Sequence, residues 1–499
     1  MELERDVILV NEDAEAQPLL PKKPVTPLPK FQLAIVLFAR LAEPIAYTQI
    51  FPYINTMVEE LHIAPPKQVG FYSGLIDSLF ALTQLCTIVH WGGLSDRIGR
   101  RPVILIGMSG VSIATLFFGL SNKLWQLLLS RALIGALCGN VAVIQSVISD
   151  ITDETNQNKA FPLPALIWYM GAVIGPLIGG LLSHPAERYP NVFGSIPLLK
   201  ERPFFLPCFV SVLITVTATL VTVFFLEESL PRITRAKRLK SPSATEAPSS
   251  ASNDVEDPQK LGATEGASQT FGLLSSPTVR RVVFAGFVME FLMMGFDTVF
   301  VLWSYTPLSL GGLQRKPAEI GLVLSVVGTF GIASTTVIFP YLHERFKSVP
   351  IFATCVTFFG LVYAMVPFVG LVVRKVLPPV SPEQPAPPLK GLWGLVLALL
   401  VAARTGAMAY PAYLLVVKEA MPDPESVGAL YGLATAAGCL GEGTAPAVVS
   451  SLFALSIDKH LLGGNFVWAV MTGLGIFAAW FAQSLKQRNK VGLDNSPAY

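Results

Sequence analysis

The chain has 499 residues, of which 52% are hydrophobic and only 14% are charged. Soluble globular proteins carry about 25% charged residues, so this composition excludes an ordinary soluble protein. The formal net charge of +2 is small, and we therefore expect no nucleic-acid partner.

Twelve apolar segments are long enough to cross a bilayer as helices, which takes about 20 residues each. They cover residues 31–55, 70–91, 102–121, 123–149, 161–183, 203–226, 280–303, 318–340, 349–372, 391–417, 426–453 and 463–485. We therefore predict an all-α polytopic membrane protein with twelve transmembrane helices. The predicted domains are a disordered cytoplasmic N-terminus (1–30), a six-helix bundle (31–226), a cytoplasmic linker (227–279), a second six-helix bundle (280–485) and a cytoplasmic C-terminal tail (486–499).

The distribution of positive charge predicts the orientation in the membrane. An even number of spans places both ends of the chain on the same side. With Arg280 and Arg281 assigned to the loop before span 7 and Lys123 to the loop before span 4, 22 Lys and Arg residues outside the spans lie on the side of the termini and 11 on the other. Cytoplasmic loops are enriched in Lys and Arg, so both termini are expected in the cytoplasm.

The polar N-terminus contains a short pattern that resembles an acidic dileucine sorting signal. Glu15 precedes Leu19 and Leu20 in the string EAQPLL. Such signals are read by sorting adaptors that route eukaryotic membrane proteins to vacuoles or lysosomes, and they also match by chance. Two interpretations stay open, a vacuolar or lysosomal address and a tail without function. The plasma membrane is the alternative location.

Ionisable residues inside the spans are the first candidates for function, because each is costly in a bilayer without a partner or a task. Span 1 contains Arg40 and Glu43, three positions apart on one helix face, and span 2 contains Asp77. One interpretation of span 1 is a mutual ion pair. The other makes Glu43 a proton carrier, because a carboxylate in a dry cavity can load and release a proton as access alternates.

A short basic turn, HWGGLSDRIGRRP, joins spans 2 and 3 between His90 and Pro102. Each of its arginines would cost roughly 2.5–3.5 kcal/mol or more in hydrocarbon, so the turn is expected at a membrane face. Its glycines allow a sharp bend and a close approach of neighbouring helices. The candidate functional residues of this turn are Gly93, Asp96, Arg97, Gly99, Arg100 and Arg101.

Spans 4 and 5 contribute two further patterns. Span 4 contains Arg131 at the start of RALIGALCGN, either as a coupling residue or as an arginine that fixes helix contacts. Span 5 contains glycines at positions i, i+4 and i+8, which form one smooth helix face, and tight packing alone would explain this spacing. The span-5 pattern consists of Gly171, Gly175, Pro176, Gly179 and Gly180.

The second half of the chain repeats part of this organisation and adds acidic residues. Arg404 in span 10 corresponds to Arg131 in span 4. Glu290 and Asp297 lie seven residues apart on one face of span 7, and Glu442 lies between two glycines of span 11. The residues that we predict to carry coupling and substrate contact are Glu43, Arg131, Asp297, Arg404 and Glu442.

Taken together, these strings resemble the major facilitator superfamily of secondary transporters. The order G-x-L-S-D-R-x-G-R-R-P resembles its loop between helices 2 and 3. The run R-x3-G-x3-G from Arg131 resembles the span-4 motif of its proton-coupled members, and G-x3-G-P-x2-G-G in span 5 is the antiporter motif of the twelve-helix drug–proton antiporters. Within these, ARLAEPIAY and WGGLSDRIGRRP are most similar to the zinc-induced-facilitator-like group.

The resemblance implies two related six-helix bundles that face each other, with the substrate site at the midplane between them. It also implies proton-coupled export of small organic molecules or metal chelates from the cytoplasm. Asp96, Arg97 and Arg101 would then form a gate that links the two halves on the cytoplasmic side.

We therefore predict a monomeric proton-coupled antiporter that works by alternating access, with protons, a small molecule and the lipid bilayer as its partners. Two alternatives stay open: a proton-coupled symporter or facilitator for a nutrient such as a sugar, and a receptor that transports nothing and signals through residues 227–278. We expect no enzymatic activity, cofactor or metal site, because the chain contains neither a G-x4-G-K-[ST] loop nor the H-E-x-x-H spacing.

Overall fold

The computed structural model describes residues 26–65, 68–153, 155–156, 160, 163–230, 273–377, 390–420 and 427–493. These residues form helices and connecting loops, and no strand occurs among them. Twelve spans in the described ranges are long and apolar enough to cross a membrane, which confirms the predicted fold class. The predicted sorting signal with Glu15, Leu19 and Leu20 lies outside the described residues, as does most of the predicted linker.

The first half of the chain provides six spans. They are α1 (Lys30–Thr48), α3 (Val69–Ile98), α4 (Arg100–Leu120), α5 with α6 (Leu124–Leu137 and Asn140–Ile151), α8 (Leu163–Leu182) and α12 (Phe205–Phe225). Short helices occupy two of the connections: α2 (Ile54–Glu60), α9 (Pro185–Arg188), α10 (Pro190–Phe193) and α11 (Pro197–Glu201).

The second half provides the other six spans. They are α15 (Pro277–Tyr305), α16 (Pro317–Ala333) with α17 (Phe339–His343), α18 (Ser348–Val376), α19 (Trp393–Gly406) with α20 (Ala409–Glu419), α21 (Val427–Asp458) and α22 (Phe466–Leu493). Helix α22 continues past residue 485, so the predicted C-terminal tail begins inside this helix. A π-helical turn, Ser334–Ile338, joins α16 to α17.

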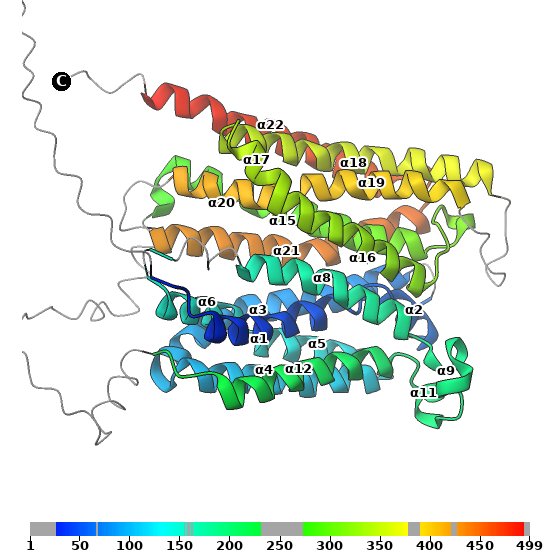
Figure 1. The fold of residues 1–499 in the computed structure, drawn as a ribbon. Helices are drawn as coiled ribbons and strands as arrows, with labels where there is room; N and C mark the ends of the chain where they lie inside the picture. Colours follow the sequence, from blue (N-terminus) through cyan, green and yellow to red (C-terminus); the bar gives the residue numbers. More distant parts are fainter. Residues whose placement is uncertain are drawn as a thin grey trace, which may run out of the picture.

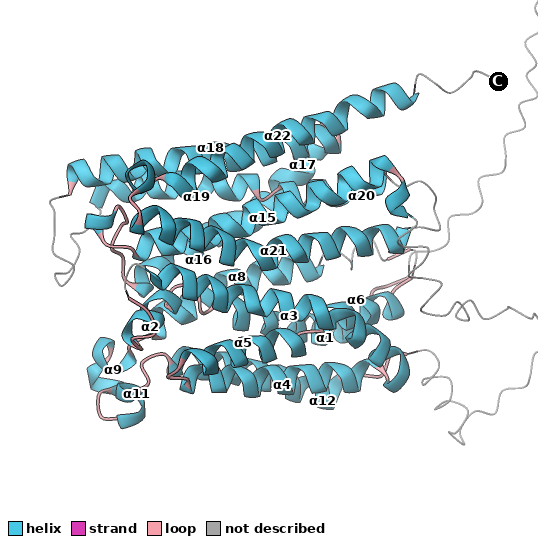
Figure 2. Cartoon of the chain, turned by 180° about the vertical axis from the view of Figure 1, so that it is seen from behind, coloured by secondary structure: helices cyan, strands magenta, loops and turns pink. Residues whose placement is uncertain are grey.

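Successive spans run in opposite directions, so their ends define two faces of the molecule (Figure 1). The terminal face carries the start of α1 and the end of α22. The distal face carries α2, α9 and α11. The helices of the first half lie together in the lower part of Figure 1, those of the second half lie in the upper part, and the view from behind shows the same division (Figure 2).

The outer surface of the helices is apolar, as expected for side chains that contact lipid. Phe117, Phe224 and Trp480 are 62%, 73% and 64% exposed. Exposed large apolar side chains in such numbers would make a soluble protein aggregate, whereas lipid tails solvate them. The structure is therefore that of an integral multi-pass membrane protein.

Spans 4 and 10 are each interrupted near the middle. In span 4, α5 ends at Leu137 and α6 begins at Asn140, and in span 10, α19 ends at Gly406 and α20 begins at Ala409. The two interruptions occupy the same position in the two halves. Both spans are predicted as continuous from the sequence, because apolar composition does not reveal a break in the hydrogen bonds of a helix.

The two halves contact each other where α8 packs on α16 and where α3 packs on α21. A Cβ atom at Gly180 would lie only 3.0 Å from the Cα atom of Gly321. The hydroxyl of Ser325 donates a 2.7 Å hydrogen bond to the carbonyl of Val173, again across the two halves. Gly180 and Gly321 lie near the distal ends of α8 and α16, so their contact holds the halves together on the distal side.

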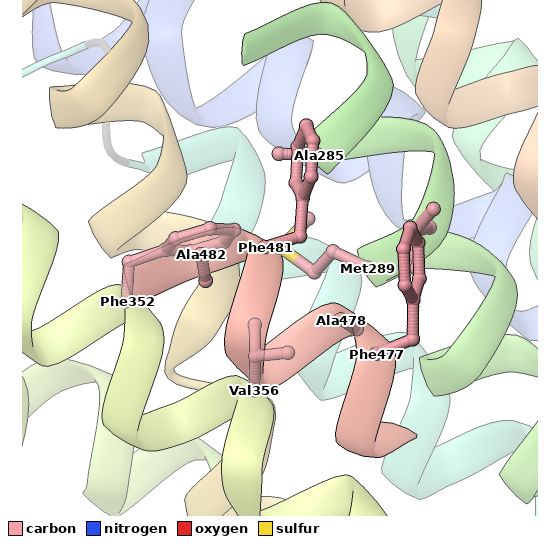
Figure 3. Close-up of a pocket in the computed structure, with 9 residues that line it drawn as sticks. Ala285, Met289, Phe352, Val356, Phe477, Ala478, Phe481 and Ala482 are labelled. Carbon is pink, nitrogen blue, oxygen red and sulfur yellow. The ribbon is translucent and has the colours of Figure 1, made fainter. Parts of the chain in front are cut away.

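A small apolar pocket lies within the second half, between α15, α18 and α22 (Figure 3). Its walls include Met289, Phe352 and Phe481, and every residue that lines it is apolar. A pocket without polar groups cannot orient a polar substrate or move a proton, so the candidate site lies elsewhere.

Candidate functional site

The ionisable side chains in the interior of the spans gather into three ion pairs and two further acids. The pairs are Arg40–Glu43, Arg131–Asp77 and Arg404–Asp297. The remaining acids are Glu290 and Glu442, for which the described residues provide no ion pair. All five residues that the sequence predicts for coupling, Glu43, Arg131, Asp297, Arg404 and Glu442, belong to this group.

Arg40 and Glu43 form an ion pair within α1, as their three-residue spacing allows, and neither is more than 8% exposed. Gln84 of α3 donates a 3.1 Å hydrogen bond from Nε2 to the other carboxylate oxygen of Glu43. The same amide group donates a 3.0 Å hydrogen bond to the carbonyl of Cys138, at the interruption of span 4. Glu43 is therefore connected through Gln84 to the place where span 4 is broken.

Arg131 of α5 is completely buried beside Asp77 of α3. Its Nη2 lies 3.6 Å from Asp77 Oδ1, which is close enough for an ion pair but too long for a hydrogen bond. The rings of Tyr47 and Phe80 lie 5.4 and 4.9 Å from the guanidinium carbon. The guanidinium nitrogens have no hydrogen-bond partner among the described residues. This pair is therefore incompletely satisfied, and a proton or a polar ligand can change its state.

A glycine brings Arg131 to Asp77. A Cβ atom at Gly135, one helical turn after Arg131, would lie 2.1 Å from the carbonyl oxygen of Phe80. Any larger residue there would push α5 away from α3 and lengthen the distance between the arginine and the aspartate. The glycine of the R-x3-G-x3-G pattern therefore has a structural role in building the ion pair.

Asp297 of α15 and Arg404 of α19 form a bidentate ion pair in the second half. The two guanidinium nitrogens lie 2.9 and 3.1 Å from the two carboxylate oxygens. Paired, parallel hydrogen bonds of this kind are stronger and more directional than a single contact. About a fifth of each side chain is exposed, so the pair borders accessible space rather than lying in a sealed core.

Glu442 of α21 is the acid that faces the first half. It interacts electrostatically with Glu43 and Arg40 of α1, and its side chain also interacts with Tyr47. The neighbouring glycines let α21 lie close to two helices, since Cβ atoms at Gly441 and Gly443 would contact α15 and α3. The structure thus brings together acids from opposite halves of the protein that the sequence predicted separately.

Glu290 of α15 lies inside the protein and is only 9% exposed. It is not among the five residues that the sequence predicts for coupling. It packs against α21, where Cβ atoms at Gly438 and Gly441 would lie 3.3 Å from its side chain. It also interacts electrostatically with Glu442. The two acids without an ion pair therefore interact with each other, and Glu290 packs beside Gly441, which precedes Glu442 in the chain.

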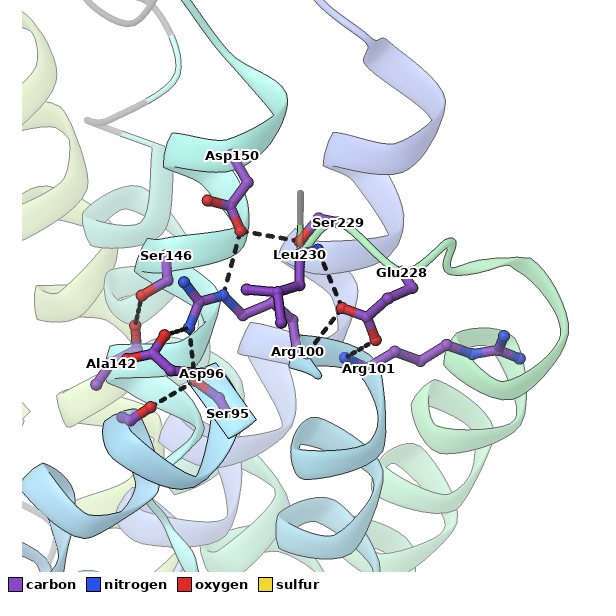
Figure 4. A network of polar contacts seen from close by, with 11 residues as sticks. Ser95, Asp96, Arg100, Arg101, Ala142, Ser146, Asp150, Glu228, Ser229 and Leu230 are labelled. Atoms are coloured by element: carbon purple, nitrogen blue, oxygen red, sulfur yellow. Dashed lines mark hydrogen bonds and ion pairs between the residues drawn. The ribbon is translucent and has the colours of Figure 1, made fainter. Parts of the chain in front are cut away.

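The basic turn between α3 and α4 forms a polar network at the terminal face (Figure 4). Gly99 alone separates the two helices, and its φ of +110° is a conformation that residues with a Cβ rarely adopt. The side chain of Arg100 donates to Ser95 at 2.7 Å, to Asp96 at 2.5 Å and to Asp150 of α6 at 3.1 Å. Arg100 therefore fastens α3 and α4 to α6.

Two acids that the sequence analysis did not single out complete this network. Glu228, just after α12, accepts hydrogen bonds from the backbone N–H groups of Arg100 and Arg101 at 2.8 and 3.2 Å. A carboxylate in this position satisfies free N–H groups and the positive end of the dipole of α4. Asp150 also accepts a 3.1 Å hydrogen bond from Ser229. Acids at the ends of apolar segments usually contact water, so no local signal in the sequence distinguishes these two.

The observed partners of this turn all belong to the first half. Arg101 donates to the carbonyl of Val223 in α12, while Asp96 and Arg97 are exposed. In this conformation the turn therefore ties α3, α4, α6 and α12 together. The gate between the halves that the sequence suggested for Asp96, Arg97 and Arg101 stays a prediction.

The glycines of the span-5 pattern allow α8 to lie directly against α1. Cβ atoms at Gly171, Gly175 and Gly179 would lie 2.4 Å from Pro44, 2.1 Å from Thr48 and 1.8 Å from the backbone of Gln49. Gly180 instead faces α16, and the carbonyl of Pro176 would lie 2.3 Å from a Cβ atom at Gly321. The pattern therefore packs α8 on α1 within the first half and on α16 across the two halves.

We expect Gly179→Ala to destabilise the protein. The added methyl group would meet the carbonyl oxygen of Gln49, and overpacking of a tight contact costs about 1–3 kcal/mol. The measurement is the apparent melting temperature of the purified protein in detergent. Gly473→Ala in α22 is the matched control, because no described atom lies within 4 Å of that Cβ position. Equal melting temperatures for the two variants would contradict the packing role.

Comparison with known proteins agrees with this architecture. The sequence model of the Major Facilitator Superfamily matches residues 36–446. The "Major facilitator-type transporter psiT2" of Psilocybe cyanescens is 34% identical, over 96% of this chain and 93% of that protein. The "Major facilitator superfamily multidrug transporter mfsB" of Aspergillus fumigatus is 25% identical over 94% and 86%. "Protein ZINC INDUCED FACILITATOR-LIKE 1" of Arabidopsis thaliana is 31% identical over 61% and 62%.

A solved structure supports the same fold. The bacterial homolog of the human lysosomal transporter Spinster, in an inward-facing and unoccupied conformation, aligns with a TM-score of 0.65. The alignment covers 94% of this chain and 99% of that chain at 16% sequence identity, which supports the fold alone. Together with the match of the family model, these relatives confirm the resemblance to the drug-efflux group and its zinc-induced-facilitator-like members. The chain belongs to the major facilitator superfamily and is a membrane transporter of that family.

Proposed function

We propose that this transporter is a proton-coupled antiporter that exports small organic molecules or metal chelates from the cytoplasm by alternating access. The proposal rests on one observation above all: Glu442 of α21, in the second half, interacts electrostatically with Glu43 of α1, in the first half, and its side chain also interacts with Tyr47. Acids from the two halves of the molecule therefore interact with each other.

The interaction between Glu43 and Glu442 would link proton binding to the movement of the halves. Two ionised carboxylates repel each other, so a proton on one of them favours the arrangement in which Glu43 and Glu442 are close. Release of the proton restores the repulsion and favours separation of the halves. A proton then shifts the equilibrium between conformations because it binds one of them more tightly than the other.

Two further features support efflux rather than uptake. The span-5 glycine pattern builds the contacts of α8 with α1 and α16, and this pattern resembles that of drug–proton antiporters. One relative over most of the chain is named a multidrug transporter. The terminal face, which carries most of the basic residues by the sequence count, would then face the cytoplasm. The host membrane in this proposal is that of a vacuole, a lysosome or the cell surface.

Transport by the full-length protein in sealed vesicles tests the direction of coupling. The probes are the organic cation ethidium, the anion carboxyfluorescein and zinc citrate, each tested with the membrane potential clamped to zero. Antiport predicts that at least one probe accumulates in vesicles with an acidic interior, and that a protonophore abolishes the accumulation. Accumulation in vesicles with an alkaline interior would instead show symport. Vesicles without the protein provide the control for passive entry.

A further inference from the structure

We propose that Gln84 of α3 is a positioning residue that links the charge on Glu43 to the break between α5 and α6. When Glu43 takes up a proton, Gln84 loosens its hold on the break, and span 4 changes from an interrupted to a continuous helix. The inference rests on the proposed function in one respect, since that proposal makes Glu43 an acid that binds and releases protons.

The break leaves backbone groups without their helical partners. Helix α5 ends at Leu137 and α6 begins at Asn140, so the last carbonyls of α5 and the first N–H groups of α6 are not paired within a helix. In a continuous helix the carbonyl of Ala136 would accept from the N–H of Asn140. The carbonyl of Cys138 would likewise accept from the N–H of Ala142. Unpaired backbone groups are costly in a bilayer, so other groups must satisfy these carbonyls.

Two side chains of α3 take the place of the missing N–H groups. Trp91 donates a 2.7 Å hydrogen bond from Nε1 to the carbonyl of Ala136. Gln84 donates a 3.0 Å hydrogen bond from Nε2 to the carbonyl of Cys138. Trp91 also fills the space beside the break, since a Cβ atom at Gly139 would lie 1.9 Å from its ring. Helix α3 therefore keeps span 4 interrupted by pairing carbonyls that a continuous helix would pair itself.

The contact of Gln84 depends on an acid, whereas that of Trp91 does not. The indole of Trp91 has a single N–H, and the amide of Gln84 has two. Nε2 of Gln84 also donates a 3.1 Å hydrogen bond to Oε1 of Glu43. A hydrogen bond to an ionised carboxylate is stronger than one to a neutral group, so ionised Glu43 holds the amide within reach of Cys138. A proton on Glu43 weakens this hold and leaves the carbonyl of Cys138 to the N–H of Ala142.

Other ionisable groups around Glu43 influence how readily it takes up a proton. They are Arg40 of α1, the thiol of Cys138, and Cys439 and Glu442 of α21. Arg40 pairs with Oε2 of Glu43 and favours the ionised acid, whereas Glu442 opposes it. Within the described part of the chain, the hydrogen bonds of Gln84 alone join Glu43 to the carbonyl of Cys138. Gln84 is therefore the group through which a change of charge reaches the backbone of span 4.

Hydrogen–deuterium exchange of the full-length protein in lipid nanodiscs tests this link without requiring transport. Closure of the break would pair the N–H groups of residues 140–142 and slow their exchange. Glu43→Gln removes the charge and is expected to slow this exchange about tenfold, the difference between a charged and a neutral hydrogen bond. Gln84→Met has a similar length without a donor and should slow it about tenfold or more.

Combining the variants shows whether Gln84 carries the effect of Glu43. The double variant of Glu43→Gln with Gln84→Met should exchange no more slowly than Gln84→Met alone, because both changes act through one contact. Trp91→Phe is the matched control. It releases the carbonyl of Ala136 but leaves Gln84 in place, so its effect should add to that of Glu43→Gln. Lower pH should slow exchange, relative to an unstructured peptide, in the wild type and Trp91→Phe but not in Gln84→Met.

Additive effects of Glu43→Gln and Gln84→Met would overturn the inference, as would a pH dependence that survives in Gln84→Met. Should Gln84→Met not fold, Gln84→Asn takes its place, because the shorter amide cannot reach both partners. Symport in the vesicle experiment, together with non-additive exchange effects, would refute the antiport proposal and leave this link standing. Antiport together with additive effects would refute this link alone.

Discussion

Glu442→Gln should abolish the acceleration of transport by a pH gradient while leaving the protein folded and in the membrane. The amide has nearly the same shape as the acid but cannot take up or release a proton, so approach of the halves no longer depends on protonation of this residue. Coupling free energies of about 1–3 kcal/mol correspond to effects of about 5–150-fold. We therefore expect the ratio of flux with the pH gradient to flux without it to lie in this range for the wild type and to equal one for Glu442→Gln.

The measurement is flux in vesicles at equal and at opposed pH, with probe exchange at equal pH as the readout of a working carrier. Glu43→Gln should behave in the same way, because Glu43 is the acid of the first half that interacts electrostatically with Glu442. Glu344→Gln on the surface serves as the matched control. If both Glu442→Gln and Glu43→Gln kept wild-type acceleration by the gradient, these two acids would not lie on the proton path.

Arg131→Leu is expected to lower the stability of the protein more than any other single change considered above. It leaves Asp77 buried as an acid without its cation, and removal of one partner of a buried ion pair costs about 3–5 kcal/mol. The double variant Arg131→Leu with Asp77→Asn should recover a large part of this loss, because neither charge then remains.

Thermal unfolding in detergent gives the apparent melting temperatures for this comparison. Arg345→Leu, an exposed arginine of the second half, is the matched control, and surface changes of this kind usually stay within about 0.5 kcal/mol. A double variant that is as unstable as Arg131→Leu alone would show that the loss comes from packing against Tyr47 and Phe80 and not from the unpaired charge.

Hydropathy was sufficient to predict the spans, because lipid requires about 20 apolar residues per crossing whatever the sequence of the loops. It was less informative within the spans. The segment 31–55 contains both the end of α1 at Thr48 and the start of α2 at Ile54, and the apolar residues between them conceal this boundary. The interruptions after Leu137 and Gly406 were also not predicted, since the glycines and polar residues beside them occur elsewhere in the spans without a break.

The candidate site was only partly predictable, for a related reason. The free-energy cost of an ionisable side chain in the bilayer marks each such residue individually, so both Arg131 and Asp77 could be identified from the sequence. Their pairing depends on how α5 packs on α3, and Gly135 permits this close packing without showing which helix it packs on. Glu228 was missed because it follows the last apolar residue of its span, and acids in that place usually contact water. Its role appears only when the start of α4 is seen beside it.

The matched interruptions of spans 4 and 10 have a mechanical consequence. A helix that is broken halfway is softer at that point than a continuous one, since fewer backbone hydrogen bonds resist bending there. Arg131 lies on the distal side of one break and Arg404 on the distal side of the other, each anchored to an acid of its own half. Under the proposed alternating access, a bend at these breaks would move α6 and α20 while both ion pairs, on the distal side of the breaks, stay in place.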